Sequence, residues 1–221
     1  MQSSTVVAIH TAMPMVEPTK ELFTRHMPEV RLINITDDSL IQDIISAGNV
    51  PEAVKERLLG YYHSAILAGA DLIFNTCSSV GDIAISARDS LSIPLVKIDD
   101  AMAEMAVKSG SRIGVLATLS TTLDPTVRLL RKFAADMDRE LVIVEGLADG
   151  AFEAVLSGDT GKHDRLILDT AGKMRDQVEL FVLAQGSMAR MENQLESHTG
   201  KRVLSSPESG VLKVKEVLQN L

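Results

Sequence analysis

The fold is decided by the stretch at residues 72–82, which reads Leu-Ile-Phe-Asn-Thr-Cys-Ser-Ser-Val-Gly-Asp. Its first three residues are apolar in succession, as in a strand that is covered on both faces of a parallel sheet. A polar loop around Cys77 follows, and Ser79 with Asp82 has the spacing of a helix N-cap and its acidic partner. The sequence therefore predicts a strand, a polar loop and a helix start within this one stretch.

A similar stretch follows 108 residues later. Leu180–Ser187 reads Leu-Phe-Val-Leu-Ala-Gln-Gly-Ser, so that Cys77 and Gln185 occupy matching places. A second pair of segments agrees at nearly the same spacing, since the segment from Thr11 matches the segment from Thr118 at an offset of 107. Two independent matches at nearly one offset indicate an internal duplication. The rival explanation is chance, because all open α/β units share such features.

Apolar, β-rich runs alternate with amphipathic helical segments along the whole chain. This alternation predicts an α/β fold of two similar Rossmann-like lobes with parallel sheets, related by a pseudo-two-fold axis. We place the first lobe at residues 1–109 and the second at 110–206, with a C-terminal helix at 207–221 that could pack back on the first lobe. The predicted strands are Val6–His10, Arg31–Ile35, Asp71–Asn75, Pro94–Ile98, Arg112–Ala117, Leu141–Val144, Leu180–Ala184 and Arg202–Leu204. The predicted helices include Glu52–Leu67, Asp100–Lys108, Val127–Asp136 and Asp164–Gln177.

The topology predicts where a ligand binds. In parallel α/β sheets the ligand lies beyond the carboxyl ends of the strands, which here means the cleft between the two lobes. The loops after the first and third strand of each lobe should line this cleft. Their hydroxyl and amide groups suit a carboxylate without requiring an arginine. The candidate substrate-binding residues are His10, Thr11, Asn75, Thr76, Ser78, Ser79, Thr118, Thr121, Gly186 and Ser187.

Cys77 has the clearest chemistry of these loops. A helix N-terminus offers unpaired N–H groups and a partial positive charge, which lower the pKa of a thiol toward neutrality. The alternative is a buried structural cysteine, although the flanking Asn75, Thr76 and Ser78 are polar. His10 ends the first strand, where it could supply a proton or a hydrogen bond, or simply cap the backbone.

The composition narrows the class of protein. The 221 residues are 45% hydrophobic and carry a formal net charge of −8, which disfavours nucleic acid and anionic membranes as partners. The apolar runs are shorter than the roughly 18 residues of a membrane span, and no basic secretory signal opens the chain. A single cysteine excludes an internal disulfide framework and fits a reducing, cytoplasmic location. The five histidines are scattered, so no metal site is expected.

Two further features of the sequence are assigned no function. Gly158–His163 resembles part of a phosphate loop, but the required first glycine is replaced by Leu156 and the Ser/Thr by His163, so the segment predicts a turn before a helix. Arg190 lies beyond Ser187 on a predicted helix, where it could anchor a second carboxylate, although a solvated helix face is the simpler interpretation.

A family resemblance follows from these loops. The Asn75–Ser79 loop, the Ala-Thr-x-x-Thr loop at Ala117–Thr121 and the third-strand loop around Gln185 together resemble the aspartate/glutamate/hydantoin racemase superfamily over essentially the whole chain. The resemblance implies a cofactor-independent enzyme with two Rossmann-like lobes. It also implies two cysteines, one per lobe, which remove and return a proton on opposite faces of a carbon next to a carboxylate or carbonyl. Cys77 matches the first of these cysteines.

Gln185 stands where the second cysteine is expected. A carboxamide neither takes nor gives a proton near pH 7, and Ser187 is an unactivated alcohol. We therefore expect Cys77 as the only catalytic thiol, with Gln185 and the loop amides holding an oxyanion or enediolate. One-face chemistry such as decarboxylation, elimination or tautomerisation fits this arrangement, as does cis–trans isomerisation by a cysteine nucleophile.

The leading hypothesis is an isomerase or lyase of the racemase superfamily that acts on a small carboxylate or amide substrate. The alternative is a non-catalytic protein that binds small carboxylates and has lost one acid/base group. The thiol distinguishes the two, because a catalytic Cys77 should react quickly with iodoacetamide near pH 7 and be protected by ligand. Neither hypothesis requires a cofactor, and homo-oligomerisation is compatible with both.

Overall fold

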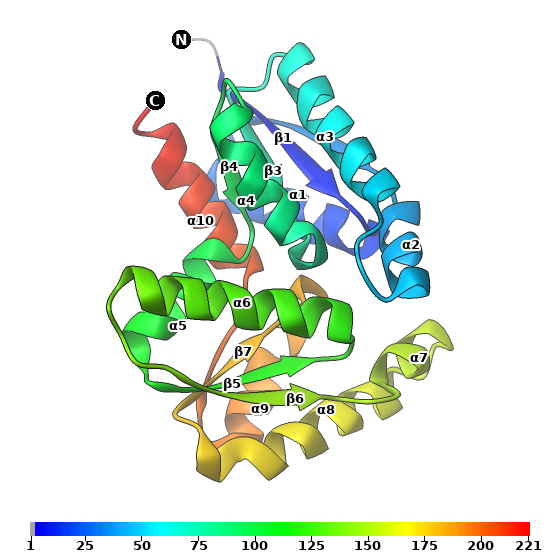
Figure 1. Cartoon of the computed structure of the whole chain (residues 1–221), viewed down its shortest axis with the longest axis vertical. Coiled ribbons are helices and arrows are strands. Elements are labelled where there is room, and N and C mark those ends of the chain that lie inside the picture. Colours follow the sequence, from blue (N-terminus) through cyan, green and yellow to red (C-terminus); the bar gives the residue numbers. More distant parts are fainter. Residues whose placement is uncertain (1–2) are drawn as a thin grey trace. The chain divides into compact units, whose positions relative to one another are not determined.

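The computed structural model describes residues 3–221 and divides them into two compact α/β units (Figure 1). One unit contains the chain up to Asp100 together with Pro207–Leu221, and the other contains Ala101–Ser206. Each unit holds a four-stranded parallel sheet, with strand orders β2-β1-β3-β4 and β6-β5-β7-β8. The predicted α/β class with two parallel sheets is confirmed, and the two sheets have equivalent connectivity.

Every predicted strand is present, with shifts at the ends. The first sheet consists of β1 (Thr5–His10), β2 (Arg31–Thr36), β3 (Leu72–Asn75) and β4 (Leu95–Lys97). The second sheet consists of β5 (Arg112–Ala117), β6 (Val142–Leu147), β7 (Leu180–Leu183) and β8 (Arg202–Leu204).

The helices connect successive strands, except α10, which follows β8. The first unit contains α1 (Val16–His26), α2 (Ser39–Ala47), α3 (Glu52–Leu67), α4 (Gly81–Ala87) and α10 (Pro207–Leu218). Along the second unit lie α5 (Asp100–Ser109), α6 (Ser120–Asp136), α7 (Ala151–Leu156), α8 (Thr160–Met174) and α9 (Glu192–Thr199). Short 3₁₀ segments include η2 (Ser78–Val80) and η5 (Gly186–Met191).

Helix α6 begins earlier than predicted. The sequence predicted a helix over Val127–Asp136, and a proline inside a helix removes a backbone hydrogen bond. The structure begins it at Ser120 and keeps Pro125 inside it. Burial of Thr122 and Leu123 before the proline explains the difference, since packing of one helix face outweighs local propensity.

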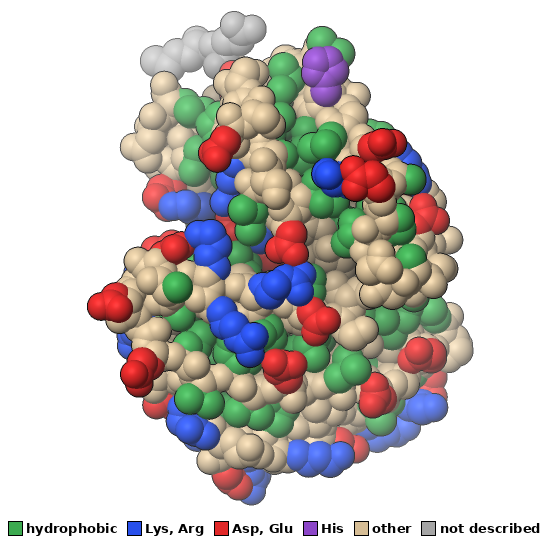
Figure 2. Space-filling view, in the orientation of Figure 1, with side chains coloured by type: hydrophobic (Ala, Val, Ile, Leu, Met, Phe, Trp, Pro, Cys, Tyr) green, Lys and Arg blue, Asp and Glu red, His purple; other side chains and the backbone are tan. Residues whose placement is uncertain are grey.

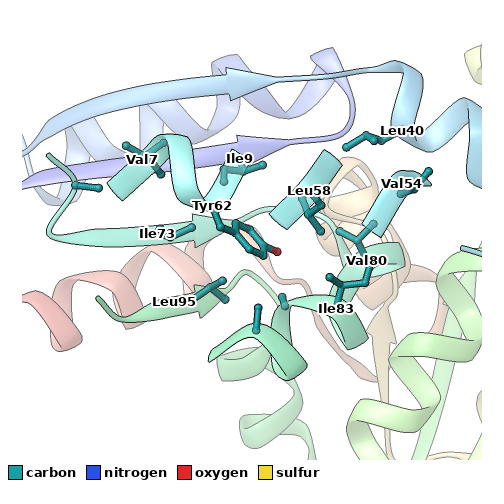
Figure 3. Close-up of a cluster of buried hydrophobic side chains, with 14 of the residues drawn as sticks. Val7, Ile9, Leu40, Val54, Leu58, Tyr62, Ile73, Val80, Ile83 and Leu95 are labelled. Carbon is teal, nitrogen blue, oxygen red and sulfur yellow. The ribbon is translucent and has the colours of Figure 1, made fainter. Parts of the chain in front are cut away.

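Both faces of the first sheet are covered, because successive residues of a strand point to opposite sides. On one face, Val7 and Ile9 of β1 pack with Tyr62 of α3 (Figure 3). On the other face, Val6 packs in a cluster with Phe23 of α1. The unbroken apolar run of β1 therefore fits a strand at the centre of a sheet that is covered on both sides.

The C-terminal helix α10 lies beside α1 in the first unit (Figure 1). Its Val211 and Val214 join the buried cluster that contains Val6. Gly210 allows this close approach, because a Cβ at this position would lie only 2.5 Å from the carbonyl oxygen of Ile98. Helix α10 thus completes the core of the first unit.

The second sheet is covered by α6 on one side and by α8 and α9 on the other, as Figure 1 shows. Leu116 of β5 and Leu183 of β7 pack with Ile167 and Ala171 of α8. Gly114 of β5 leaves room for Phe181 and α8, because a Cβ there would lie 2.7 Å from the Phe181 ring and 3.3 Å from Met174 Cε.

Equivalent hydrogen bonds fix the carboxyl edges of the two sheets. The Thr76 N–H donates to Ile9 O at 3.1 Å in the first unit, and the Ala184 N–H donates to Leu116 O at 2.9 Å in the second. Cys77 and Gln185, the residues after these two N–H donors, therefore lie at the same position relative to their own sheets.

The surface carries charges of both signs. Acidic and basic side chains are interspersed on the face that Figure 2 shows. Among residues 3–221, no helix has the length and apolar character needed to cross a membrane.

The half-buried carboxylate of Asp37 holds the end of β2 next to β1. The Asp37 N–H donates to His10 O at 3.0 Å, and its carboxylate accepts from Tyr61 Oη at 2.6 Å, from Ser39 Oγ at 2.7 Å and from Arg57. Burial alone raises the pKa of Asp37, but the hydrogen bonds from Tyr61, Ser39 and Arg57 outweigh it and lower the pKa to about 2. The carboxylate is thus stabilised in its charged form.

We predict that Asp37→Asn lowers the free energy of unfolding by about 2 kcal/mol at pH 7. A lowered folded pKa stabilises the protein above the unfolded pKa of about 3.9, and this stability is lost as the pH falls toward 2. Urea unfolding of both proteins at pH 7 and pH 3 measures the effect. The wild type should lose the larger share of its stability between these pH values, and an equal loss in the variant would contradict the role of Asp37.

Candidate active site

Strand β3 carries Cys77 to the carboxyl edge of the first sheet. The backbone remains extended at Cys77, with φ −123° and ψ 120°, and then turns into η2. The Cys77 side chain is half-buried and packs against the cluster that contains Tyr62 and Val80. The loop therefore holds a thiol in one defined conformation directly after a central strand.

Four donor groups around the Cys77 sulfur influence its pKa. Burial is the largest influence and raises the pKa of the thiol above its ordinary value. Hydrogen bonds to the thiolate from the Thr11 hydroxyl, the backbone N–H groups of Ser79 and Val80, and the Ser79 hydroxyl lower the pKa and offset part of this rise. The Ser79 hydroxyl is buried and, by its geometry, makes no hydrogen bond to any residue of 3–221, so it influences the thiolate without yet being bonded to the sulfur. The thiolate, once formed, is thus hydrogen-bonded in a site that otherwise favours the neutral thiol.

Two expectations about this loop are wrong. The sequence predicted a thiol pKa lowered toward neutrality, but burial outweighs the donors and raises the pKa of Cys77. The sequence also predicted Ser79 as the helix N-cap, whereas Ser79 lies inside η2 and the N-cap of α4 is Val80, without a side-chain cap. The short 3₁₀ turn is the reason, since it shifts the helix start beyond Ser79.

Asn75 and Tyr62 fix the backbone of the Cys77 loop through two hydrogen bonds. The Tyr62 hydroxyl donates to Asn75 Oδ1 at 3.0 Å, and Asn75 Nδ2 donates to the Cys77 carbonyl at 3.0 Å. Both side chains are buried. Tyr62 lies on an apolar helix stripe and gave no sequence signal of this role, because a buried tyrosine at that spacing is typical of core.

His10 is enclosed at the end of β1. Its Nε2 lies 2.8 Å from Asn34 Oδ1, and its Nδ1 lies 2.8 Å from Thr76 Oγ1. A proton on Nε2 lets the ring donate to Asn34 and accept from the Thr76 hydroxyl. Burial lowers the pKa of His10, against a smaller opposing influence of the Asn34 hydrogen bond, so the ring is neutral at pH 7. These contacts join the ends of the strands that carry Thr11 and Cys77.

A buried ionic cluster ends β4 beside this loop. Lys97 pairs with Asn75 in the strand register, and its Nζ lies 3.4 Å from Asp99 Oδ1 and 3.6 Å from Asp100 Oδ1. Lys97 and Asp99 are both about 2% exposed. Gly81 makes room for the lysine, because a Cβ there would lie 2.9 Å from Lys97 Cε. Opposite charges meet inside the unit, as buried charges require.

Gln185 occupies the corresponding place in the second unit. Its φ of −125° and ψ of 130° are close to the angles of Cys77, and it precedes η5 as Cys77 precedes η2. Gln185 Oε1 accepts from the Thr118 N–H at 2.8 Å, and its Nε2 donates to Thr118 Oγ1 at 2.7 Å. Thr11 and Cys77 form the matching pair in the first unit.

The remaining predicted residues lie near these two pairs in their own units. Ser78 is buried next to Cys77, Gly186 is half-buried next to Gln185, and Ser187 is exposed. Thr121 lies in the first turn of α6, and its enclosed hydroxyl has no hydrogen-bond partner within residues 3–221. Each unit thus presents its predicted polar loops at the carboxyl edge of its own sheet.

A cluster of three residues in the second unit was not predicted. His163 Nδ1 lies 2.7 Å from Asp164 Oδ1, and Arg190 donates to both oxygens of Asp164. The sequence predicted a turn at Gly158–His163, and for Arg190 either an anchor for a carboxylate or a solvated helix face. The available signal was the spacing of His163 with Ile167 and Ala171, which places the histidine on the buried stripe of α8.

Known proteins resemble this chain in sequence and in fold. The family model described as "Asp/Glu/Hydantoin racemase" matches residues 5–214. The chain belongs to this family. A glutamate racemase of Vibrio parahaemolyticus serotype O3:K6 is 28% identical over 152 residues, which make up 67% of this chain and 56% of that protein. The chain thus spans little more than half the length of this curated relative.

Solved structures of racemases share the fold. A glutamate racemase from Bacillus anthracis matches with a TM-score of 0.77 and 14% identity over 100% of this chain and 83% of its own. An allantoin racemase from Klebsiella pneumoniae matches with a TM-score of 0.73 and 17% identity, over 98% of this chain and 88% of its own. An aspartate racemase homologue from Pyrococcus horikoshii OT3 matches with a TM-score of 0.71 and 20% identity, over 98% of this chain and 99% of its own. These matches show the two-unit racemase fold.

We predict that Cys77 reacts slowly with iodoacetamide at pH 7, in place of the quick reaction that the sequence led us to expect of a catalytic thiol. The rate should rise only at a pH above the ordinary pKa of a thiol, because the thiolate is the nucleophile and burial raises the pKa of Cys77. Thr11→Val should raise the pKa further and lower the rate at pH 8 roughly tenfold, since one hydrogen bond to the thiolate is lost. Thr11→Ser keeps the hydroxyl and serves as the control. Equal rates for the valine and serine variants would show that Thr11 does not stabilise the thiolate.

Proposed function

We propose that this chain is a cofactor-independent isomerase that transfers a proton at a carbon alpha to a carboxylate or carbonyl, with Cys77 as its catalytic thiol. The observation that carries the proposal is the group of donors around the Cys77 sulfur. A structural cysteine needs none of them, whereas an acid/base group needs them whenever it is charged.

The raised pKa defines the resting form of the thiol. Burial favours the neutral S–H at pH 7, so that Cys77 begins as a proton donor. After donation, the thiolate accepts hydrogen bonds from Thr11, Ser79 and Val80, and these bonds reduce the free energy needed to form it. The same thiolate then removes a proton in the reverse reaction.

The Thr118–Gln185 pair of the second unit leaves a hydrogen-bond donor free. Because Gln185 Nε2 donates to Thr118 Oγ1, the proton of the Thr118 hydroxyl remains available for an oxyanion or carboxylate. The neutral loops of both units suit a small carboxylate or amide. One solved relative, a glutamate racemase from Francisella tularensis, is described in complex with D-glutamate, and others act on allantoin or aspartate. Glutamate, aspartate and allantoin are therefore the first substrates to test.

The carboxamide at 185 favours a second candidate. Gln185 transfers no proton near pH 7, so a reaction that needs one proton donor, such as decarboxylation followed by protonation on one face, fits the two loops. A protein that only binds small carboxylates would use the same donors. Proton exchange separates these candidates, because an isomerase releases the alpha proton of its substrate to solvent while a binding protein does not.

We predict that the wild type exchanges the alpha proton of at least one of these substrates in D₂O, and that Cys77→Ser lowers inversion by about 10²-fold or more, since a serine hydroxyl is a far weaker acid than a thiol. Proton NMR follows the exchange, and circular dichroism follows the inversion. Ser64→Ala on the exposed face of α3 is the matched control and should behave as wild type. Full inversion by Cys77→Ser would rule out the thiol as the acid/base.

A further inference from the structure

The loop that carries Gln185 lacks a hydrogen bond that the loop of Cys77 has. In the first unit, Asn75 Nδ2 donates to the Cys77 carbonyl and so fixes the backbone of that loop. At the offset of 108 residues, Leu183 takes the place of Asn75, and its apolar side chain packs with α8 and offers no donor. The Gln185 carbonyl instead accepts from the Met188 N–H at 3.0 Å, within η5. The position of Gln185 therefore depends on where η5 lies.

An ion pair joins η5 to α8. Arg190 of η5 donates through Nη1 to Asp164 Oδ2 at 2.9 Å and through Nη2 to Asp164 Oδ1. Two parallel bonds fix the direction of the guanidinium as well as its distance, which a lysine ammonium could not do. The hydrogen bond from Arg190 is the largest influence on the pKa of Asp164 and lowers it against the opposing effect of burial, so the carboxylate is charged at pH 7.

His163 lies against this ion pair. Its Nδ1 is 2.7 Å from Asp164 Oδ1 and 3.1 Å from Arg190 Nη2. With a proton on Nδ1 the ring donates to the carboxylate, and without one it accepts from the guanidinium, so each tautomer has one favourable contact with the pair. The ring is 6% exposed and the Asp164 side chain 21%. An ion pair that is partly shielded from water contributes more than a fully exposed one.

The ion pair adds direction to the packing of η5. Met188 and Met191 are buried in the cluster that contains Ile167 of α8. Apolar packing of this kind is non-directional, so by itself it lets a short segment shift along a helix. The contact between Arg190 and Asp164 fixes that shift. Because Gln185 directly precedes η5, the same contact fixes the place from which the Gln185 side chain extends.

Gln185 passes this placement on to Thr118. Its Oε1 accepts from the Thr118 N–H at 2.8 Å, and its Nε2 donates to Thr118 Oγ1 at 2.7 Å. The second bond occupies a lone pair of the hydroxyl oxygen and so directs the hydroxyl proton away from Gln185. A shift of η5 would lengthen both bonds and release this orientation.

We propose that Arg190 and Asp164 are positioning residues for the Thr118 donor, because their ion pair holds Gln185 where its carboxamide orients the Thr118 hydroxyl. This inference rests on the proposed function, in which that hydroxyl binds an oxyanion or a carboxylate of the substrate. All four residues belong to the second unit. The assignment also gives Arg190 a role other than anchoring a second carboxylate of the substrate, since Asp164 already occupies its guanidinium.

Amide hydrogen exchange, followed by NMR, tests the proposal without a substrate. In Arg190→Met we expect the Thr118 N–H to exchange about tenfold faster, because its acceptor is held less firmly. The N–H of Val115, in the middle of β5, should keep its rate, since it reports the stability of the whole sheet. Lys132→Met is the matched control, because it breaks an exposed ion pair on α6 of the same unit and should leave the Thr118 rate unchanged.

Variants of both partners separate one shared contact from two independent contributions. Arg190→Lys keeps the charge but loses the second parallel bond, so its Thr118 exchange rate should be intermediate. Asp164→Asn should resemble Arg190→Met. The double variant should exchange no faster than the more affected single variant, because each change removes the same contact. Additive acceleration in the double variant would contradict a shared role.

Turnover tests the link to the proposed function. With whichever of glutamate, aspartate and allantoin the wild type inverts, Arg190→Met should lower kcat/KM about tenfold, as expected for a weakened hydrogen bond to the substrate. The pH profile of Cys77 alkylation should stay unchanged, because Cys77 belongs to the other unit.

Three results would overturn the assignment or its basis. An unchanged Thr118 exchange rate in Arg190→Met would overturn the positioning role. Equal acceleration at Thr118 and Val115 would also overturn it, because the ion pair would then only stabilise the unit as a whole. A wild type that inverts none of the three compounds would overturn the proposed function, whereas the exchange rates would still decide whether the ion pair holds Thr118.

Discussion

The parallel pairing of the first and third strand of each unit is the constraint on which the site depends. This pairing brings the chain ends after β1 and β3, and after β5 and β7, to one edge of their own sheet. The backbone bonds from Thr76 to Ile9 and from Ala184 to Leu116 then fix the height at which Cys77 and Gln185 appear. A shift of register by one residue would turn these side chains to the opposite face of the sheet. The strand pairing therefore decides which side chains the loops can present.

Two opposing effects act on Cys77. Removal from water penalises the thiolate, and convergent donors stabilise it. An exposed thiol with the same donors would be charged at rest and open to alkylation and oxidation, whereas burial alone would leave it inert. The combination suits a group that must hold a proton and release it within one reaction. The support of Asn75 and Tyr62 beneath the loop keeps the sulfur where both effects apply.

The sequence allowed the strands, the two sheets and the equivalence of Cys77 with Gln185 to be predicted, because apolar runs and a repeat at fixed spacing are local patterns. It did not allow the direction of the Cys77 pKa to be predicted, since a helix start is visible in residues but burial by distant side chains is not. Pro125 inside α6 and the His163–Asp164 contact depend likewise on tertiary packing. The predicted lobe boundaries and the roles of the substrate-binding residues stay predictions.

Helix α10 makes the two units differ in the order in which their residues are synthesised. The second unit consists of one continuous stretch, Ala101–Ser206, and all of this stretch precedes α10. The first unit lacks Val211 and Val214 until α10 has been made, which leaves the face of β1 that carries Val6 incompletely covered. A chain truncated before Pro207 would therefore expose apolar surface of the unit that carries Cys77, and such surface promotes aggregation.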